Sequence, residues 1–384
     1  GASTGEFEAL ELRDGDAERF HGKGVLKAVD NVINNFGPAL IGKDASNQKE
    51  IDDLLINIDG TSNKSTFGAN ASLGISMACS VVSADFYNKP LYHYLNPNSN
   101  IMPIPMINVL NGGMHADQGS DLQEIMLFPH GAKNFKHSLQ MGSEIFHCLK
   151  KELKKKGLGT TVGDEGGFAP ALHSNDHAIE LLLNAIEKAG FNIGKDTSLA
   201  LDVAASSLYK DNKYHLKVDE SVLDTDGMIR FYEDLVNKYP IVSIEDGLDE
   251  NDWKGWADMN KELGSKIQIV GDDLTVTNPE KLQKAIDQGT MNSILIKLNQ
   301  IGTVSETIEA IELAKSNNMD YIISHRSGET EDTFISDLTV AMGGGQIKTG
   351  SVCRSDRTAK YNRLLRIEEQ IENPSLCNSL SFIK

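Results

Sequence analysis

From about residue 97 to the end of the chain, short apolar runs alternate with longer amphipathic stretches. This alternation is typical of βα units and of a parallel sheet. Helix signals punctuate it: Asn278 precedes Pro279, with Gly289 beyond, and Thr303 with Glu306 forms a capping box. Eight runs are candidate strands, at residues 106–110, 124–128, 198–203, 241–245, 267–270, 293–297, 321–324 and 345–348.

The opening of this region departs from strict alternation. The first two runs follow each other without a helix, and two helical stretches, at about 134–156 and 175–189, then follow without a strand. The pattern predicts an α/β fold, an irregular (β/α)8 barrel of ββαα(βα)6 type. Residues 1–96 read as helices and loops, and the connection at 88–105 is rich in proline and asparagine. We therefore expect a smaller domain at 1–96 and a catalytic barrel at 97–384.

Composition narrows the class of protein. The 384 residues are 40% hydrophobic and 24% charged, which is ordinary for a globular protein. The net charge of −18 argues against nucleic acid and anionic lipid as partners. The most apolar stretch, 71–87, is short for a membrane span and contains Asp85. Four cysteines without metal-ligand spacing fit free thiols in the cytoplasm. The opening residues have no basic or apolar region of the kind found in signal peptides, and with no initiator Met we expect residues upstream of Gly1.

Charged residues follow the predicted strands where barrel enzymes carry their catalytic groups. They are Glu124, Asp202, Glu245, Asp272, Asp273, Lys297, His325, Arg326 and Lys348. A single strand-end acid is more often an ordinary loop residue. Three on consecutive strands, Asp202, Glu245 and Asp272, would repel one another strongly without a cation. An all-oxygen donor set of this kind suits Mg²⁺.

The basic residues suggest a base and an anion site. Lys297 ends an apolar run, and a lysine placed near a divalent ion and other cations has its ammonium form disfavoured, which makes a neutral amine available near pH 7. Its alternative is a snorkelling strand lysine. Lys348, Arg326 and His325 add positive charge suited to a carboxylate or phosphate.

Three glycine-containing loops are further candidates. GDEGG at 163–167 carries Asp164 and Glu165 on a turn that a substrate could approach closely, although a solvated turn is equally consistent. GASTG at 1–5 is a candidate lid. NGGMH at 111–115 ends in His115, and a lone histidine is more often structural.

Longer motifs resemble one family. IVSIEDGLDENDW, IVGDDLTVTNP, ILIKLNQIGT, ISHRSGETEDTF, GQIKTGSVCRSDR, VGDEGGFAP, LNGGMHAD and GASTG occur in order over almost the whole chain and are similar to enolase (phosphopyruvate hydratase), with a bacterial appearance. The resemblance implies reversible dehydration of 2-phospho-D-glycerate to phosphoenolpyruvate in glycolysis and gluconeogenesis. It also implies two Mg²⁺ ions per site and a homodimer or octamer.

The resemblance also implies roles for individual residues. Lys297 is similar to the base that removes the proton beside the carboxylate, and Glu165 to the acid that assists loss of the hydroxyl, supported by Glu124 and His325. Asp202, Glu245 and Asp272 would hold the first ion and Ser3 the second. The implied substrate contacts are His115, Gln123, Arg326, Ser327 and Lys348.

Two departures from the family pattern accompany the match. Family members begin with further strands before GASTG, so 1–96 resembles an incomplete α+β capping domain, and the placement of Ser3 is in doubt. Ser207 stands where the family commonly has Glu, and we expect only a local packing change there.

Three rival functions stay open. Another enolase-superfamily acid lyase would share the metals but not the phosphate contacts. A Schiff-base aldolase would use Lys297 but give the carboxylates no purpose. A truncated chain could serve a non-catalytic binding role.

Overall fold

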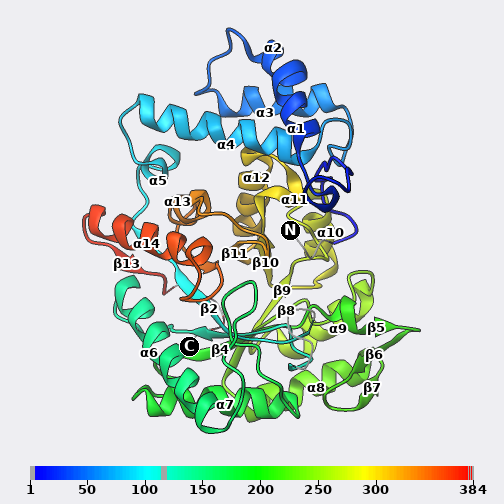
Figure 1. The fold of residues 1–384 in the computed structure, drawn as a ribbon, viewed down its shortest axis with the longest axis vertical. Helices are drawn as coiled ribbons and strands as arrows, with labels where there is room; N and C mark the ends of the chain where they lie inside the picture. The colour runs from blue at the N-terminus through cyan, green and yellow to red at the C-terminus, as the bar shows by residue number, and fades with distance from the viewer. Residues whose placement is uncertain (1–4, 114–118, 379, 381, 383–384) are drawn as a thin grey trace.

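A closed barrel of eight strands forms the centre of the fold in the computed structural model, which describes residues 5–113, 119–378, 380 and 382 (Figure 1). Neighbouring strands around the barrel run β2-β3-β4-β8-β9-β10-β11-β12 and return to β2. Every predicted run overlaps one of them, which confirms the barrel. Their bounds are β2 (Ile104–Asn111), β3 (Glu124–Phe128), β4 (Ser198–Asp202), β8 (Ile241–Glu245), β9 (Gln268–Gly271), β10 (Ser293–Ile296), β11 (Asp320–Ser324) and β12 (Gln346–Lys348).

Strand β3 runs against both of its neighbours, whereas the other adjacent pairs are parallel. The reversal follows from the direct β2–β3 connection, because a parallel pair needs a longer crossover. It also changes which end of β3 faces the active end of the barrel. Glu124 opens β3 and pairs with Asp202, which closes β4. The first residue of β3 therefore lies level with the last residues of β2 and β4, the strands on either side of it.

Helices surround the barrel in the predicted order. Two come between β3 and β4, α6 (Phe135–Lys155) and α7 (Asn175–Lys188), which confirms the ββαα opening. Asn278 caps α10, with Pro279 at its first position and Gly289 left-handed after it, and Thr303 accepts from Glu306 N at α12, as predicted. The remaining barrel helices are α8 (Thr225–Lys238), α9 (Trp253–Leu263), α10 (Pro279–Gln288), α11 (Leu298–Ile301), α12 (Val304–Ser316), α13 (Phe334–Ala341) and α14 (Ser355–Gln370).

The helices between residues 20 and 95 form a layer whose α3 and α4 contact α12 and α11 and lie above them in Figure 1. Its helices are α1 (Leu26–Asn31), the π-turn η2 (Val32–Phe36), α2 (Gly37–Leu40), α3 (Gln48–Asp59), α4 (Ala69–Phe86) and α5 (Leu91–Leu95), preceded by the 3-10 turn η1 (Phe20–Gly22). The described residues of this part of the chain, 5–100, contain no strand, in agreement with the helices and loops predicted for 1–96 and with a capping domain that lacks its opening strands. Residues 9–14 belong to no helix or strand; among them, Ala9 N donates to Gln300 O in α11 and Leu10 N donates to Asn63 O.

Two small sheets were not predicted. β5 (Tyr209–Lys210), β6 (Lys213–Leu216) and β7 (Ser221–Leu223) form an antiparallel meander between β4 and α8, and β1 (Ile101–Met102) pairs with β13 (Ser375–Leu376). Their strands have two to four residues, too few to show an alternating pattern. The meander follows the mouth of the barrel at β4, and the β1–β13 pair ties the chain end to the start of the barrel.

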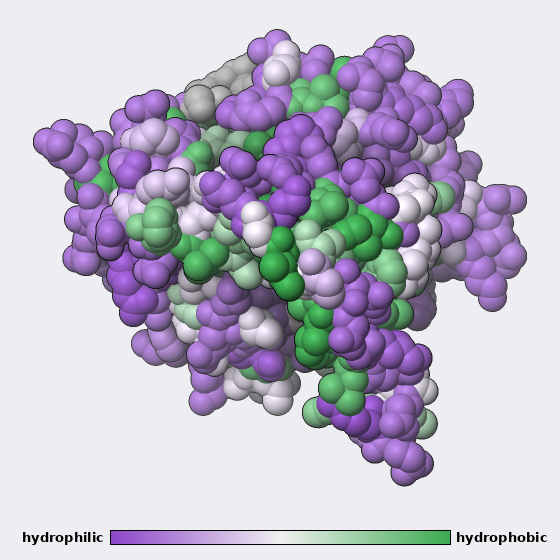
Figure 2. Space-filling view, turned by 90° about the horizontal axis from the view of Figure 1, so that it is seen from above, coloured by the Kyte–Doolittle hydropathy of each residue, from purple (hydrophilic) through white to green (hydrophobic). Residues whose placement is uncertain are grey.

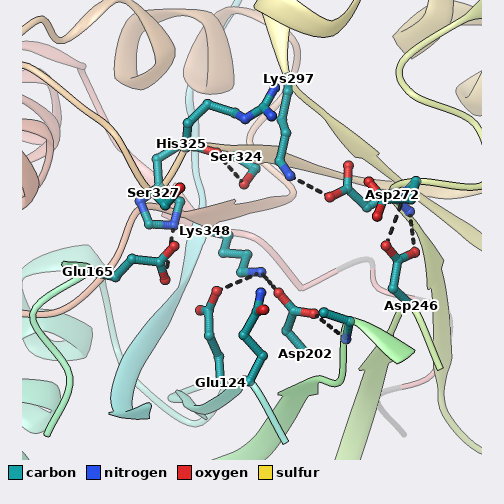
Figure 3. A pocket seen from close by; sticks show the side chains of 14 residues that line it. Glu124, Glu165, Asp202, Asp246, Asp272, Lys297, Ser324, His325, Ser327 and Lys348 are labelled. Atoms are coloured by element: carbon teal, nitrogen blue, oxygen red, sulfur yellow. Dashed lines mark hydrogen bonds and ion pairs between the residues drawn. The ribbon is translucent and has the colours of Figure 1, made fainter. Parts of the chain in front are cut away.

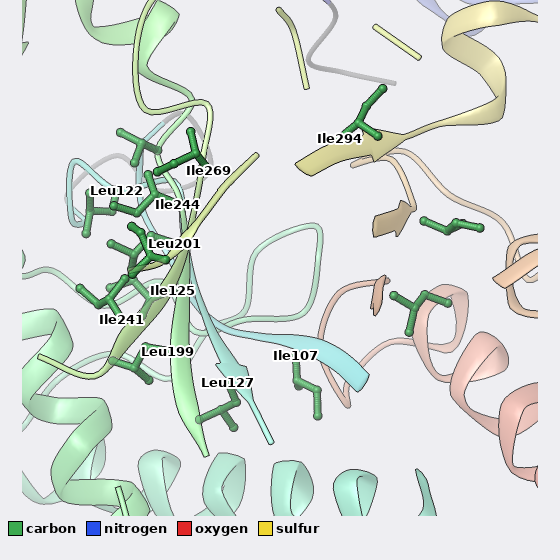
Figure 4. Packing of buried hydrophobic residues seen from close by; sticks show 14 of the residues in the cluster. Ile107, Leu122, Ile125, Leu127, Leu199, Leu201, Ile241, Ile244, Ile269 and Ile294 are labelled. Atoms are coloured by element: carbon green, nitrogen blue, oxygen red, sulfur yellow. The ribbon is translucent and has the colours of Figure 1, made fainter. Parts of the chain in front are cut away.

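The core has an inner and an outer part. Strand side chains such as Ile107 and Leu127 pack on the barrel face covered by helices (Figure 4). Gly142 allows α6 to approach β2, since a Cβ there would lie 2.3 Å from Ile107 Cδ1. Inside the barrel, an apolar cluster includes Leu380 and Phe382 from the C-terminal segment. The barrel interior is therefore packed rather than open.

The helical layer leaves apolar side chains on its outer surface. Figure 2, seen from that side, shows apolar surface between polar regions. Exposed residues of α1, η2 and α4 include Leu26, Ile33, Val82 and Phe86. Within the described residues, no helix is both long and apolar enough to cross a membrane.

The buried carboxylate of Asp52 joins α3 to the barrel. It accepts from Ser305 N at the first turn of α12 at 2.9 Å and from Gln48 Nε2 at 3.1 Å. We expect Asp52→Ala to lower the free energy of unfolding by about 1–3 kcal/mol, because buried donors lose their acceptor. Denaturant unfolding measures it. The control is Asp53→Ala, an exposed neighbour paired with Lys49, which should change stability by about 0.5 kcal/mol or less. Equal effects of the two variants would contradict this role of Asp52.

Candidate functional site

A cavity with an empty volume of about 430 Å³ lies at the end of the barrel where the parallel strands finish (Figure 3). We call it the mouth cavity. Apart from Glu245, every predicted site residue in the described part of the chain lines it, while Ser3 and His115 lie outside the described residues. The lining residues are Gln123, Glu124, Glu165, Ala204, Asp202, Asp246, Asp272, Asp273, Lys297, Ser324, His325, Arg326, Ser327 and Lys348.

The ammonium group of Lys348 lies among three carboxylates. Its Nζ is 2.6 Å from Asp202 Oδ2, 2.9 Å from Glu245 Oε2 and 3.2 Å from Glu124 Oε1. These acids occupy one row of the barrel, because Glu124 pairs with Asp202 and Asp202 with Glu245 across β3, β4 and β8. Burial lowers the pKa of Lys348, but the carboxylates more than offset this and raise the pKa well above its ordinary value. The lysine is therefore fully charged.

A second cation lies across the cavity from this row. Lys297 Nζ forms an ion pair with Asp272 Oδ2, and Gln300 Nε2 donates to Asp272 Oδ1 at 2.8 Å. Burial lowers the pKa of Lys297, but attraction to Asp272 raises it by more. The neutral amine was expected beside a divalent ion, so it stays a prediction, and the ion pair with Asp272 describes the protein without a metal. The sequence reasoning counted nearby cations but not the carboxylate that Lys297 touches.

The third group combines Glu124, Glu165 and His325. Burial, followed by repulsion from Glu165, raises the pKa of Glu124 well above its usual range. Burial therefore favours the protonated form of this carboxyl. Glu165 Oε2 accepts from Asn108 Nδ2 at 3.0 Å and lies 3.8 Å from His325 Nε2. Burial lowers the pKa of His325 well below its usual value, so this ring is neutral.

Two acids that sequence reasoning left without a role, Asp246 and Asp273, lie beside Asp272. The carboxylate of Asp246 accepts from the backbone N of Asp272 at 2.9 Å and of Asp273 at 3.1 Å, which fixes the turn after β9. Burial and repulsion from Asp272 raise the pKa of Asp273 to about 8. The signal was present as paired acids, Glu245 with Asp246 and Asp272 with Asp273. Only the fold shows that the Asp246 carboxylate, which follows β8, bonds to the backbone just after the neighbouring strand β9.

Arg326 already holds a carboxylate in anion-binding geometry. Its Nη1 lies 2.7 Å from Glu8 Oε2 and its Nη2 lies 3.0 Å from Glu8 Oε1. Glu8 also accepts from Gly5 N at 3.0 Å, so this contact ties the N-terminal segment to the mouth cavity. The side chain of Arg326 thus presents a two-point grip of the kind that binds carboxylate or phosphate.

Acid clusters at the mouth cavity could hold a metal ion. Among the described residues, two groups of three have ligand atoms within 4.8 Å of one another: Glu124, Glu165 and His325, and Asp246, Asp272 and Asp273. The three predicted metal ligands lie on two different lysines: Asp202 and Glu245 contact Lys348, whereas Asp272 contacts Lys297. Burial and repulsion from Asp202 raise the pKa of Glu245 to about 8. Its charge is thus poorly compensated, and oxygen donors of this kind suit a hard divalent cation.

Comparison with protein families assigns both parts of the chain. The family described as "Enolase, C-terminal TIM barrel domain" matches residues 99–384. The family described as "Enolase, N-terminal domain" matches residues 1–95. Together the two matches cover almost the whole sequence.

We expect Mg²⁺ to raise the melting temperature, because an ion that binds only the folded state stabilises it by about 2.7 kcal/mol at 100 times its dissociation constant. Glu245→Gln should lose most of this shift, because an amide replaces an anionic donor, and its metal-free melting temperature should also fall, because one of the two oxygens that accept from Lys348 becomes an amide nitrogen. Calorimetry with and without Mg²⁺ measures both. Asp258→Asn, an exposed acid on α9, should keep the full shift. An undiminished shift in Glu245→Gln would mean that the ion binds elsewhere.

Proposed function

The chain belongs to the enolase family and is a lyase of the enolase superfamily, and from this premise we propose that it catalyses the Mg²⁺-dependent, reversible dehydration of 2-phospho-D-glycerate to phosphoenolpyruvate. One observation carries the proposal. Lys297 and Glu165 reach into the mouth cavity from different sides, with Lys348 between them (Figure 3). A base and an acid are thus available to the two ends of the bond that becomes double.

The metal ligands in this proposal are Asp202, Glu245 and Asp272 for one ion, with Ser3 contributing to the second. The donors fit, because they are buried carboxyl groups and the raised pKa of Glu245 shows that Lys348 does not fully stabilise its charged form. When bound, Mg²⁺ supplies positive charge that stabilises a substrate carboxylate carrying a second negative charge. Lys348 would exchange its contacts with Asp202 and Glu245 for the substrate carboxylate.

Lys297 is the proposed base. Its Nζ takes the proton from C2, and the electron pair of the broken C–H bond moves onto the adjacent carboxylate. The amine must be neutral for this step, whereas its ion pair with Asp272 favours the ammonium. If Asp272 binds a metal ion instead of Lys297, the ammonium form of Lys297 is no longer favoured. The state of Lys297 is therefore linked to ligation at Asp272.

Glu165 is the proposed acid. It gives a proton to the hydroxyl on C3, the C–O bond breaks, water leaves, and the electron pair from the carboxylate forms the C2–C3 double bond. Burial raises the pKa of Glu124 and so favours its protonated form beside Glu165. Asn108 holds the Glu165 carboxylate in place. Arg326 and Ser327 would hold the phosphate, with Gln123 beside Glu124 at the cavity wall.

Formation of phosphoenolpyruvate from 2-phosphoglycerate, followed by its ultraviolet absorbance, tests the function. We expect turnover with Mg²⁺ and none after chelation. A folded protein that binds Mg²⁺ but leaves this substrate unchanged would refute the proposed reaction while preserving the metal site.

Lys297→Ala should abolish exchange of the C2 proton with solvent, a loss of about 10²–10⁴-fold or more, because the base is absent. Binding of Mg²⁺ should persist, since Asp272 loses only a competing cation. Mass spectrometry of substrate in deuterium oxide measures exchange, and calorimetry measures the metal. Exchange at the normal rate would rule out Lys297 as the base.

Glu165→Gln should separate the two halves of the reaction. Gln keeps the shape and the contact with Asn108 but cannot supply a proton, so dehydration should fall by about 10²–10⁴-fold while C2 exchange continues. Both rates are measured on the same sample. Glu144→Gln, an exposed acid on α6, is the control and should leave both rates unchanged. An equal loss of the two rates in Glu165→Gln would contradict the role of Glu165 as the acid.

A further inference from the structure

Arg357, near the start of α14, is completely buried although it does not line the mouth cavity. Its guanidinium contacts two loops that do. Nη1 donates to Arg326 O at 2.7 Å, and Nη2 donates to Ser327 O at 2.7 Å and to Asp164 O at 3.1 Å. One side chain thus joins the loop after β11 to the turn that carries Glu165.

The same guanidinium contacts the ring of His325. Nη1 of Arg357 meets Nδ1 of His325, and a guanidinium has only donors, so Nδ1 must be the acceptor. A neutral imidazole that accepts at Nδ1 carries its proton on Nε2. Nε2 is the atom that faces Glu165 Oε2 at 3.8 Å. The contact therefore determines which ring nitrogen can donate toward Glu165 and the space beside it.

The chain also makes room for this arginine. Gly350 has φ of 82°, and a Cβ there would lie 2.7 Å from Arg357 Cδ and 2.8 Å from Glu165 O. Tyr361 from the next turn of α14 donates to Gly350 O at 2.7 Å and holds this glycine against the arginine. The stem of Arg357 is thus confined as closely as its head.

We propose that Arg357 is a positioning residue for the acid half of the reaction: it holds His325 as the tautomer protonated on Nε2 and keeps the Glu165 turn in register with the Arg326–Ser327 loop. The proposal rests on the proposed function. None of the contacts described here reaches Lys297 or Asp272. Loss of Arg357 therefore affects departure of the hydroxyl more than removal of the C2 proton.

The first test needs no substrate. Long-range ¹H–¹⁵N spectra of the full chain report which ring nitrogen of each histidine carries a proton, and His325→Gln identifies the signals of His325. We expect Nε2 to be protonated and Nδ1 to be an acceptor in the wild type. A proton on Nδ1 of the wild-type ring would overturn the proposal, whether or not the protein dehydrates 2-phosphoglycerate.

The second test uses Arg357→Ala with saturating substrate. We expect the dehydration rate to fall by about 10²-fold, the loss typical of a misplaced catalytic group, while C2 exchange stays roughly unchanged. Added guanidinium should fill the vacated space, restore the Nε2 tautomer and recover dehydration. Equal losses of exchange and dehydration would overturn the proposal, as would recovery that an equal concentration of ammonium reproduces.

Arg363→Ala is the matched control. Arg363 lies on the same helix and pairs with the buried Asp337, away from the mouth cavity. It should leave the exchange-to-dehydration ratio and the His325 tautomer unchanged and should not respond to guanidinium. If Arg357→Ala does not fold, Arg357→Lys supplies the same measurements, and there a normal ratio with a normal tautomer would overturn the proposal. Wild-type turnover of 2-phosphoglycerate tests the proposed function separately.

Discussion

The mouth of the barrel is organised by the need to hold several buried carboxylates close together. Strand pairing places Glu124, Asp202 and Glu245 in one row, and no apolar neighbour could offset their repulsion. The Lys348 ammonium does so by contacting all three. Its own burial is tolerable only because the acids surround it. The row of acids and Lys348 therefore depend on each other for stability. The neighbouring strands β12, β2, β3, β4 and β8 bring them together.

The lysines do not fully balance the charge of these acids, and this incomplete balance suits the acid cluster to ligand binding. Glu245 and Asp273 keep pKa values of about 8, so the available cations do not fully stabilise their charged forms. A divalent ion adds the missing charge without a further side chain. In the proposed reaction Lys348 would leave Asp202 and Glu245 to contact the substrate, and Asp272 would bind the ion in place of Lys297. The contacts of the metal-free protein are thus the ones that ligation would exchange.

The sequence predicted the barrel well because buried strands are short apolar runs and helix caps are local signals, as at Asn278 and Thr303. The site residues could be predicted because charged residues lie at the ends of those strands. What it missed depends on contacts between distant segments. Nothing local shows that Lys297 touches Asp272, so this ion pair of the metal-free protein was not predicted. Likewise, Arg357 lies over thirty residues beyond His325, and only the fold brings them together.

The two halves of the proposed reaction have different anchors. Lys297 and Asp272 are held by Gln300 and by the Asp246 carboxylate, which fixes the turn after β9. Glu165 and His325 are held by Asn108 and Arg357, from β2 and α14. Because a rigid barrel connects these sets, an acid and a base can approach one substrate from separate walls without neutralising each other. A protein that used one shared anchor would bring Lys297 and Glu165 into an ion pair, and neither would then be free to transfer a proton.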